Sequence, residues 1–302
     1  MNRKPRILIT YDAPNWAYHK NAKILQKYLS DEFDICLLYD QDKISLLRHI
    51  SQSEYDLVFF QWYKDIDIMM LSGLLHRQPC ISQIATTYIF DRDIKSTGWS
   101  GYKFWPLMIA KNKELYDMLS LQRKGLGVEL AYHVNDHEIF FKHNKPKVKN
   151  KDFTVAFVGH TDNPRKGYSL IKEACKASNV NLKTIDFSNK IPYEDLPDFY
   201  RSVDATICAS DMEGAPNPVI ESGLVGTPII TTRVGQIGEM VVNEENAIVV
   251  NRDTQSLALG IQKLQNDDTL YENISVNIYK TCYDWNMKAF GQWRKIFKKS
   301  IK

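Results

Sequence analysis

The chain has 302 residues, a net charge of +3 and a hydrophobic fraction of 44%. This length predicts two domains with a core each, and so small a charge argues against nucleic acid as a partner. The five cysteines are scattered without a CxxC pair, which argues against disulfides or a zinc site. No apolar run approaches the ~20 residues of a membrane span and we recognise no secretory leader, so we expect a cytoplasmic protein.

Strands and helices alternate through the first half of the sequence. Strands are expected at four places, 6–10, 33–39, 55–61 and 79–87. Helices are expected at 17–30, 44–51 and 69–77. A polar, lysine-rich segment, Lys142–Lys151, is expected to link this half to the next. The alternation predicts an α/β fold with a doubly wound parallel sheet.

The second half repeats the same alternation. Strands are expected at 153–159, 181–187, 204–209, 228–232 and 247–250. Helices are expected at 168–177, 193–203, 218–226, 256–266 and 284–297. A second parallel sheet is therefore predicted for this half of the chain.

One stretch of the second half, Ser210–Glu221, leads from a buried strand into a helix. Asn217 suits the N-cap of that helix and Pro218 its first position. The N–H groups at the helix start, near Val219 and Ile220, suit a diphosphate. Ligands bind at the carboxyl ends of strands in open α/β sheets, which is where this stretch lies.

Glu213 and Glu221 are eight residues apart in the same stretch. Carboxylates accept hydrogen bonds from sugar hydroxyl groups, so this pair can contact two parts of one ligand. The alternative is that Glu213 is a solvated loop residue and Glu221 only complements the helix start. Spacing alone does not decide between the two interpretations.

A basic pair, Arg165 and Lys166, stands just before the helix that is expected to begin at Tyr168. Cations at a helix N-terminus oppose the helix dipole unless an anion lies between them. This placement favours a diphosphate site, and the alternative is a solvated loop.

The run Tyr200–Glu239 resembles the donor-site core of the retaining glycosyltransferases of family 4, the glycosyl transferases group 1. Their signature is Glu-x7-Glu, which Glu213 and Glu221 match in an extended context of similar order. The resemblance implies the GT-B fold, in which two Rossmann-like domains face a cleft. It also implies that the first glutamate contacts the donor sugar and that the second contacts the ribose hydroxyl groups.

The first half is similar to the same family in weaker but ordered segments. Residues 106–119 resemble a strand and its following helix, and 131–140 resemble the segment that closes the first domain, with Val134 at the usual glycine. The resemblance implies an acceptor-side domain over 1–145 and a nucleotide-sugar-binding domain over 146–283. A C-terminal helix, 284–302, is then expected to pack back onto the first domain.

The family also implies a set of donor-site residues. Its basic pair is an arginine directly after a strand glycine and the lysine of Lys-Gly. Lys166 matches the lysine, His160 occupies the arginine position, and Arg165 is expected to supply the missing charge. Catalytic roles are expected for Glu213, Lys166 and Arg165. The expected donor-binding residues are Gly159, His160, Arg165, Lys166, Glu213, Gly214, Ala215, Asn217, Pro218, Val219 and Glu221.

The first domain departs from the family at one position. Many members carry a histidine after the fourth strand, whereas this chain has Tyr88 and Asp91 there. We place both on the acceptor side, together with Asn15 and Trp16. Asp91-Arg-Asp93 resembles the metal motif of the other glycosyltransferase fold, but three residues are a weak match and we expect no metal.

The resemblance implies transfer of a sugar from a nucleoside-diphosphate sugar, UDP- or GDP-linked, to a hydroxyl group of a glycan or lipid. Retention of the anomeric configuration and independence of metal and other cofactors are part of that expectation. Two alternatives are a non-catalytic sugar-nucleotide-binding protein or partner subunit and a sugar-nucleotide epimerase. A phosphorylase is disfavoured because no lysine-centred cofactor site is recognised. The basic, aromatic tail 293–302 is expected to dock on the first domain, and a weak contact with an anionic membrane surface, which would make the protein peripheral to the membrane, is the alternative.

Overall fold

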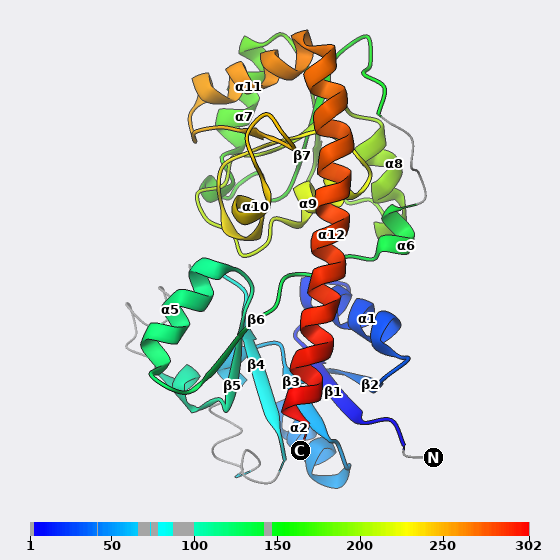
Figure 1. Cartoon of the computed structure of the whole chain (residues 1–302), viewed down its shortest axis with the longest axis vertical. Coiled ribbons are helices and arrows are strands. Elements are labelled where there is room, and N and C mark those ends of the chain that lie inside the picture. Colours follow the sequence, from blue (N-terminus) through cyan, green and yellow to red (C-terminus); the bar gives the residue numbers. More distant parts are fainter. Residues whose placement is uncertain are drawn as a thin grey trace. The chain divides into compact units, whose positions relative to one another are not determined.

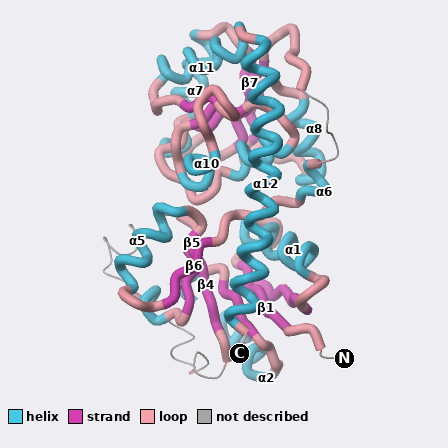
Figure 2. Tube along the Cα trace, viewed as in Figure 1, coloured by secondary structure: helices cyan, strands magenta, loops and turns pink. Residues whose placement is uncertain are grey.

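The structure, a computed structural model, describes residues 3–40, 42–65, 73, 78–86, 100–141 and 147–301. The chain divides into two compact units. Unit 1 comprises Met1–Asn135 and Met287–Lys302, and unit 2 comprises Asp136–Asn286. Each unit has a parallel sheet with helices around it, as the traces in Figures 1 and 2 show.

Unit 1 has a six-stranded parallel sheet in the order β2-β1-β3-β4-β5-β6. Its strands are β1 (Arg6–Tyr11), β2 (Asp34–Tyr39), β3 (Leu57–Phe60), β4 (Cys80–Ile84), β5 (Leu107–Ala110) and β6 (Gly127–Leu130). Its described helices are α1 (Ala17–Leu29), α2 (Lys43–Gln52) and α5 (Lys113–Arg123), with short 3₁₀ turns at Tyr63–Asp65 and Gly101–Phe104. The predicted helix at 69–77 lies outside the described residues except for position 73.

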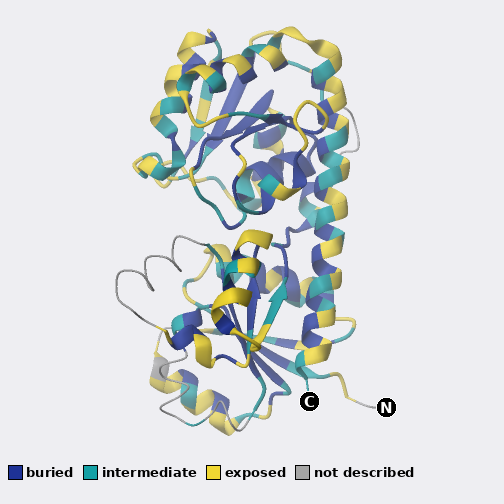
Figure 3. Ribbon diagram, turned by 60° about the vertical axis from the view of Figure 1, so that its left-hand side comes forward, coloured by how far each residue is buried: buried dark blue, intermediate teal, exposed yellow. Residues whose placement is uncertain are grey.

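The sequence of β3 explains its central place in the sheet. All four of its residues, Leu-Val-Phe-Phe, are buried, as a parallel strand covered on both faces requires. Asn112 is the N-cap of α5, where its side chain accepts a hydrogen bond of 2.8 Å from the N–H of Leu115. The core strands are accordingly the most continuously buried parts of Figure 3.

Unit 2 has a five-stranded parallel sheet in the order β11-β10-β9-β7-β8. Its strands are β7 (Thr154–Val158), β8 (Asn181–Ile185), β9 (Ala205–Cys208), β10 (Ile229–Thr231) and β11 (Ile248–Val249). Its helices are α6 (His137–Phe140), α7 (Tyr168–Ala177), α8 (Leu196–Arg201), α9 (Asn217–Leu224), α10 (Gly235–Met240) and α11 (Thr254–Asn266). The predicted parallel sheets are thus confirmed in both units.

The structure divides the chain at Asn135 and Asn286, whereas the sequence places the divisions at 145 and 283. The first division comes earlier than predicted because α6 belongs to unit 2. Its residue Phe140 is fully buried in the core of that unit. Its ring lies edge-on to Tyr193, with the ring centres 5.6 Å apart.

The last helix is longer than predicted. The sequence places its start at Asp284, but α12 runs from Asp268 to Ser300. The prediction therefore placed the start of the helix too late. The buried residues Tyr271, Ile274 and Ile278 recur at helical spacing before Asp284, and this pattern extends the helix toward its N-terminus.

The C-terminal part of α12 belongs to unit 1. Trp293 and Phe297 are fully buried there, and each packs its ring against Phe59 of β3. These side chains are therefore used inside the unit and are not offered to a membrane surface. Among the described residues, none of the helices combines the length and the apolar character that crossing a bilayer requires.

Candidate functional site

The candidate site lies in unit 2, on the loops that follow β7, β9 and β10. The carboxyl ends of parallel strands meet at one edge of the sheet, so these loops come together. Two hydrogen bonds join them directly. The N–H of Asp211 donates to the carbonyl oxygen of Arg165 (3.1 Å), and the hydroxyl group of Thr232 donates to the carbonyl oxygen of Ser210 (2.7 Å).

The loop after β7 is held close to the end of β9. Gly167 has a φ of 67°, and a Cβ atom there would lie 2.6 Å from the carbonyl oxygen of Ala209. Only glycine fits this approach without strain. Arg252, which follows β11, donates from its guanidinium group to the carbonyl oxygens of Pro164 (2.6 Å) and Ala209 (2.9 Å). The arginine therefore fastens the basic loop to the sheet edge, a contact that the sequence did not indicate.

The basic pair meets two carboxylates of the loop after β9. Lys166 Nζ forms an ion pair with Glu213, and Arg165 Nε lies 3.1 Å from Asp211 Oδ1. The sequence predicted that an anion would offset these cations before α7. In the structure, carboxylates of the protein itself, Glu213 and Asp211, offset these charges.

Glu213 is further held by its surroundings. The hydroxyl group of Ser210 donates a hydrogen bond of 2.7 Å to Oε1, the oxygen atom that Lys166 also contacts. Gly235 has a φ of 50°, and a Cβ atom there would lie 2.4 Å from the carbonyl oxygens of Glu213 and Gly214. The backbone of this loop therefore rests against the start of α10, where only a glycine leaves enough room.

Glu221 has a different environment from Glu213. It lies in α9 and is buried, and the hydroxyl group of Tyr200 in α8 donates a hydrogen bond of 2.9 Å to its Oε2. Burial and the nearby Glu221 charge raise the pKa of Tyr200 well above its ordinary value. The two glutamates of the predicted pair thus have separate partners.

The start of α9 differs from the prediction. Asn217 is the first helical residue and Pro216 precedes it, so the expected cap at Asn217 and first position at Pro218 were each one residue late. The N–H groups of Val219 and Ile220 donate to the carbonyl oxygen of Pro216 at 3.2 and 3.4 Å. These N–H groups, which we expected to bind a diphosphate, therefore already donate hydrogen bonds within the first turn of α9.

Other expected donor-site residues lie at the same sheet edge. The N–H of Gly159 donates to the carbonyl oxygen of Ile185 (2.9 Å) and so extends the pairing of β7 with β8. The ring of His160 lies edge-on to Phe187 from the loop after β8, with the ring centres 4.9 Å apart. Ala215 packs on the core of the unit.

Of the acceptor-side residues, the structure describes Asn15 and Trp16. The N–H of Asn15 donates to Nδ1 of His19 (2.8 Å), and Trp16 is exposed before the first turn of α1. Tyr88, Asp91 and the Asp91-Arg-Asp93 segment lie outside the described residues. Within the described part of the chain, no three His, Cys, Asp or Glu side chains cluster as metal ligands would.

A buried lysine at the carboxyl edge of the first sheet was not predicted. Lys111 directly follows β5, and its Nζ lies 4.3 Å from the ring centre of Trp293. Burial lowers the pKa of Lys111 to about 7. Burial and the Lys111 charge together lower the pKa of the neighbouring His133 to about 3. The sequence shows only that this lysine follows a short strand, and nothing in it indicates that the side chain is buried.

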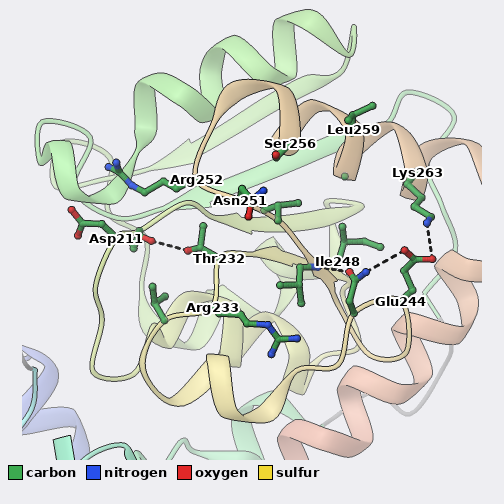
Figure 4. A pocket seen from close by; sticks show the side chains of 16 residues that line it. Asp211, Thr232, Arg233, Glu244, Ile248, Asn251, Arg252, Ser256, Leu259 and Lys263 are labelled. Carbon is green, nitrogen blue, oxygen red and sulfur yellow. Dashed lines mark hydrogen bonds and ion pairs between the residues drawn. The ribbon is translucent and has the colours of Figure 1, made fainter. Parts of the chain in front are cut away.

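A depression of about 670 Å³ opens beside β10, β11 and α11 (Figure 4). Ser210 and Asp211 reach its rim, but its cations are already engaged by the protein. Arg252 donates to backbone carbonyl groups, and Lys263 pairs with Glu244 at 2.6 Å. Neither Lys166 nor Glu213 lines this depression, so it lies apart from that ion pair.

Residues 140–281 match the sequence model of the family described as glycosyl transferases group 1. The capsular polysaccharide biosynthesis glycosyltransferase CapM of Staphylococcus aureus is 27% identical over 157 residues, which are 43% of this chain and 41% of that protein. The putative glycosyltransferase YtcC of Bacillus subtilis is 30% identical over 99 residues, or 32% of this chain and 24% of that protein. The chain thus spans less than half the length of these curated relatives.

Solved structures resemble the chain over almost its whole length. Anabaena Alr3699/HepE in complex with UDP and glucose has a TM-score of 0.75 at 14% identity, covering 98% of this chain and all of that one. Sucrose-phosphate synthase from Thermosynechococcus elongatus has a TM-score of 0.73 at 13% identity, with the same coverage. These similarities show the fold, which is GT-B. Within it, residues 140–281 form a domain of the glycosyl transferases group 1.

Proposed function

We propose that the protein is a glycosyltransferase that moves a sugar from a nucleoside-diphosphate sugar to a hydroxyl group of a glycan or lipid acceptor. The observation that carries this proposal is the meeting of Lys166 with Glu213 at the carboxyl edge of the unit 2 sheet. A cation and a carboxylate at this edge suit the two chemically different parts of such a donor, its diphosphate and its sugar.

The basic loop is assigned to the leaving diphosphate. Negative charge grows on this group as the glycosidic bond breaks, and fixed cations stabilise it most in the transition state. Lys166 and Arg165 stand on a short turn that Arg252 fastens to the sheet, so their backbone positions are set before the donor binds. These cations can neutralise the diphosphate, and a divalent ion is then not required.

The two glutamates are assigned to the hydroxyl groups of the donor. Glu213 lies next to Lys166 and is assigned to accept a hydrogen bond from a hydroxyl group of the sugar. Glu221, which Tyr200 holds in α9, is assigned to the ribose. This division follows the family resemblance of the Glu-x7-Glu signature. The resemblance also supports retention of the anomeric configuration, with the donor phosphate accepting the proton of the acceptor.

UDP is the first nucleotide to test, because Alr3699/HepE, which shares the fold, has been solved with UDP and glucose and with UDP-glucose. A thermal-shift screen against UDP-, GDP- and ADP-sugars tests the proposal. A ligand that binds only the folded state raises its stability by about 2.7 kcal/mol at one hundred times its dissociation constant. Donors that stabilise the protein are then incubated with glycan and lipid acceptors.

Each result of this screen has a distinct meaning. Transfer of the sugar to an acceptor supports the proposal. Binding without any turnover indicates a non-catalytic sugar-nucleotide-binding protein, and release of an epimer without acceptor indicates an epimerase. Failure of every donor to shift the melting temperature contradicts the proposal.

A further inference from the structure

Glu213 has two partners of different kinds on one oxygen atom. Lys166 Nζ forms an ion pair with Oε1, and the hydroxyl group of Ser210 donates to the same atom at 2.7 Å. The Glu213 side chain is 12% exposed and that of Lys166 is 32% exposed. Because the pair is partly withdrawn from water, its attraction is stronger than that of an open surface pair.

The two partners are anchored to very different degrees. Ser210 is buried, its carbonyl oxygen accepts from the hydroxyl group of Thr232 at 2.7 Å, and its hydroxyl oxygen lies 3.5 Å from Cys208 Sγ. Lys166 instead reaches Glu213 through a flexible four-carbon chain. If the three groups separate, Lys166 moves, whereas Ser210 and Glu213 stay where they are.

A diphosphate bound at the basic loop would lie beside this pair. It competes with Glu213 for the ammonium group of Lys166, and its own negative charge is repelled by the carboxylate. A carboxylate that serves the sugar therefore opposes the binding of a bare nucleoside diphosphate. Once Lys166 has turned to the phosphate, Glu213 keeps only Ser210 of these two partners and has acceptor capacity for a hydroxyl group.

We propose that Glu213 is the internal counter-ion of Lys166 until a diphosphate displaces it, and that Ser210 is the positioning residue that then holds Glu213 for the donor sugar. This inference rests on the proposed function. It implies that the sugar contact and the phosphate contact form in one event, since binding of the diphosphate makes the carboxylate available.

Glu213→Gln gives a direct test, because the amide keeps the shape of the side chain and removes its charge. In calorimetry the variant should bind UDP about three- to tenfold more tightly than the unaltered protein, since a competing carboxylate near the phosphate is gone. Its affinity for UDP-glucose should rise less, so the preference for the sugar-bearing ligand falls. Weaker or unchanged binding of UDP overturns the inference.

Asp162→Asn is the matched control. Asp162 is an exposed carboxylate of the basic loop, so solvent screens its charge, whereas Lys166 and Arg165 pair with Glu213 and Asp211. We expect UDP affinity to change by less than about twofold in this variant. An equal tightening in both variants would show a general effect of net charge and would overturn the inference.

Ser210→Ala separates positioning from charge. The variant should bind UDP within about twofold of the unaltered protein, yet lose affinity for UDP-glucose, because Glu213 is no longer held. In the Glu213→Gln background the same change should add little, since coupled residues are not additive. Full additivity overturns the role of Ser210. If the unaltered protein binds none of UDP, GDP and ADP, the proposed function fails and the inference with it. If it binds UDP but Glu213→Gln does not tighten binding, the inference alone fails.

Discussion

The hydroxyl group of Tyr200 donates a hydrogen bond of 2.9 Å to Oε2 of Glu221, and both side chains are buried in unit 2. A buried carboxylate needs such a partner, because its desolvation is otherwise uncompensated. The tyrosine thus fixes the carboxylate that the family resemblance assigns to the ribose. The consecutive helices α8 and α9 are thus joined at the point where a nucleotide is expected.

Glu221→Ala should weaken the binding of every nucleotide tested, because the ribose is present in all of them. Tyr200→Phe should lower the free energy of unfolding by about 1–2 kcal/mol and weaken UDP about fivefold, since it removes one hydrogen bond to a charged group. Calorimetry with UDP and urea unfolding measure the two effects.

The double variant, Tyr200→Phe with Glu221→Ala, shows whether Tyr200 acts through Glu221. We expect its loss of UDP affinity to match that of Glu221→Ala alone, as for two residues in one contact. Losses that simply add would assign Tyr200 a role in packing only.

Lys166→Ala should lose affinity for nucleoside diphosphates by ~1.5–3 kcal/mol, the usual contribution of a charge-assisted hydrogen bond. Its affinity for the bare nucleoside should not change, because the nucleoside has no phosphate. Lys172→Ala, which removes an exposed lysine of α7, is the matched control. The same loss for nucleoside and diphosphate would place Lys166 away from the phosphates. Arg165→Ala tests in the same assay whether this residue compensates for His160.

The sequence predicted the parts of the site that depend on local order along the chain. Apolar runs alternate with helical segments, so both parallel sheets followed from the sequence. The placement of Glu213 and Glu221 around a strand end followed from the same local pattern. Local order also fixes the loop that carries Lys166, because it directly follows β7 and precedes α7.

The contacts that complete the site could not be predicted, because they join distant segments. Lys166 and Glu213 are 47 residues apart, and Arg252 reaches Pro164 across 88 residues. Neither pairing leaves a periodic pattern. Val219 and Ile220 differ from the expectation for a local reason, because the helix starts one residue earlier and their N–H groups donate to Pro216.

Lys111 should make the stability of the protein depend on pH. Its pKa is about 7 when folded, against 10.5 for an ordinary lysine. Between these values the unfolded chain binds a proton that the folded protein does not, so stability rises with pH from about 7 to about 10.5. Below pH 7 both states are protonated, and the full cost of burying the charge is present.

Lys111→Met, which keeps the length and apolar stem of the side chain, should therefore stabilise the protein. We expect a gain of about 2–4 kcal/mol near pH 6 that shrinks toward pH 10, measured by urea unfolding at several pH values. His133 stays neutral over this range because its pKa is about 3. Lys113→Met, at an exposed position of α5, is the control and should show no such trend. A gain that is equal at pH 6 and pH 9.5 would contradict the buried charge as its cause.

The last prediction concerns metal and stereochemistry together. If Lys166 and Arg165 neutralise the leaving diphosphate, transfer should continue in excess EDTA, because fixed cations replace the divalent ion. The product should keep the anomeric configuration of an α-linked donor, since the family to which the donor loop is similar retains it. One reaction answers both questions when it is run with EDTA and the anomeric coupling constant of the product is measured by NMR. Strict dependence on Mg²⁺ or Mn²⁺ would turn attention to Asp91-Arg-Asp93, which Asp91→Asn then tests. A β-linked product would instead require a side-chain base in the first domain, because an inverting reaction needs a group that takes the acceptor proton from the opposite face.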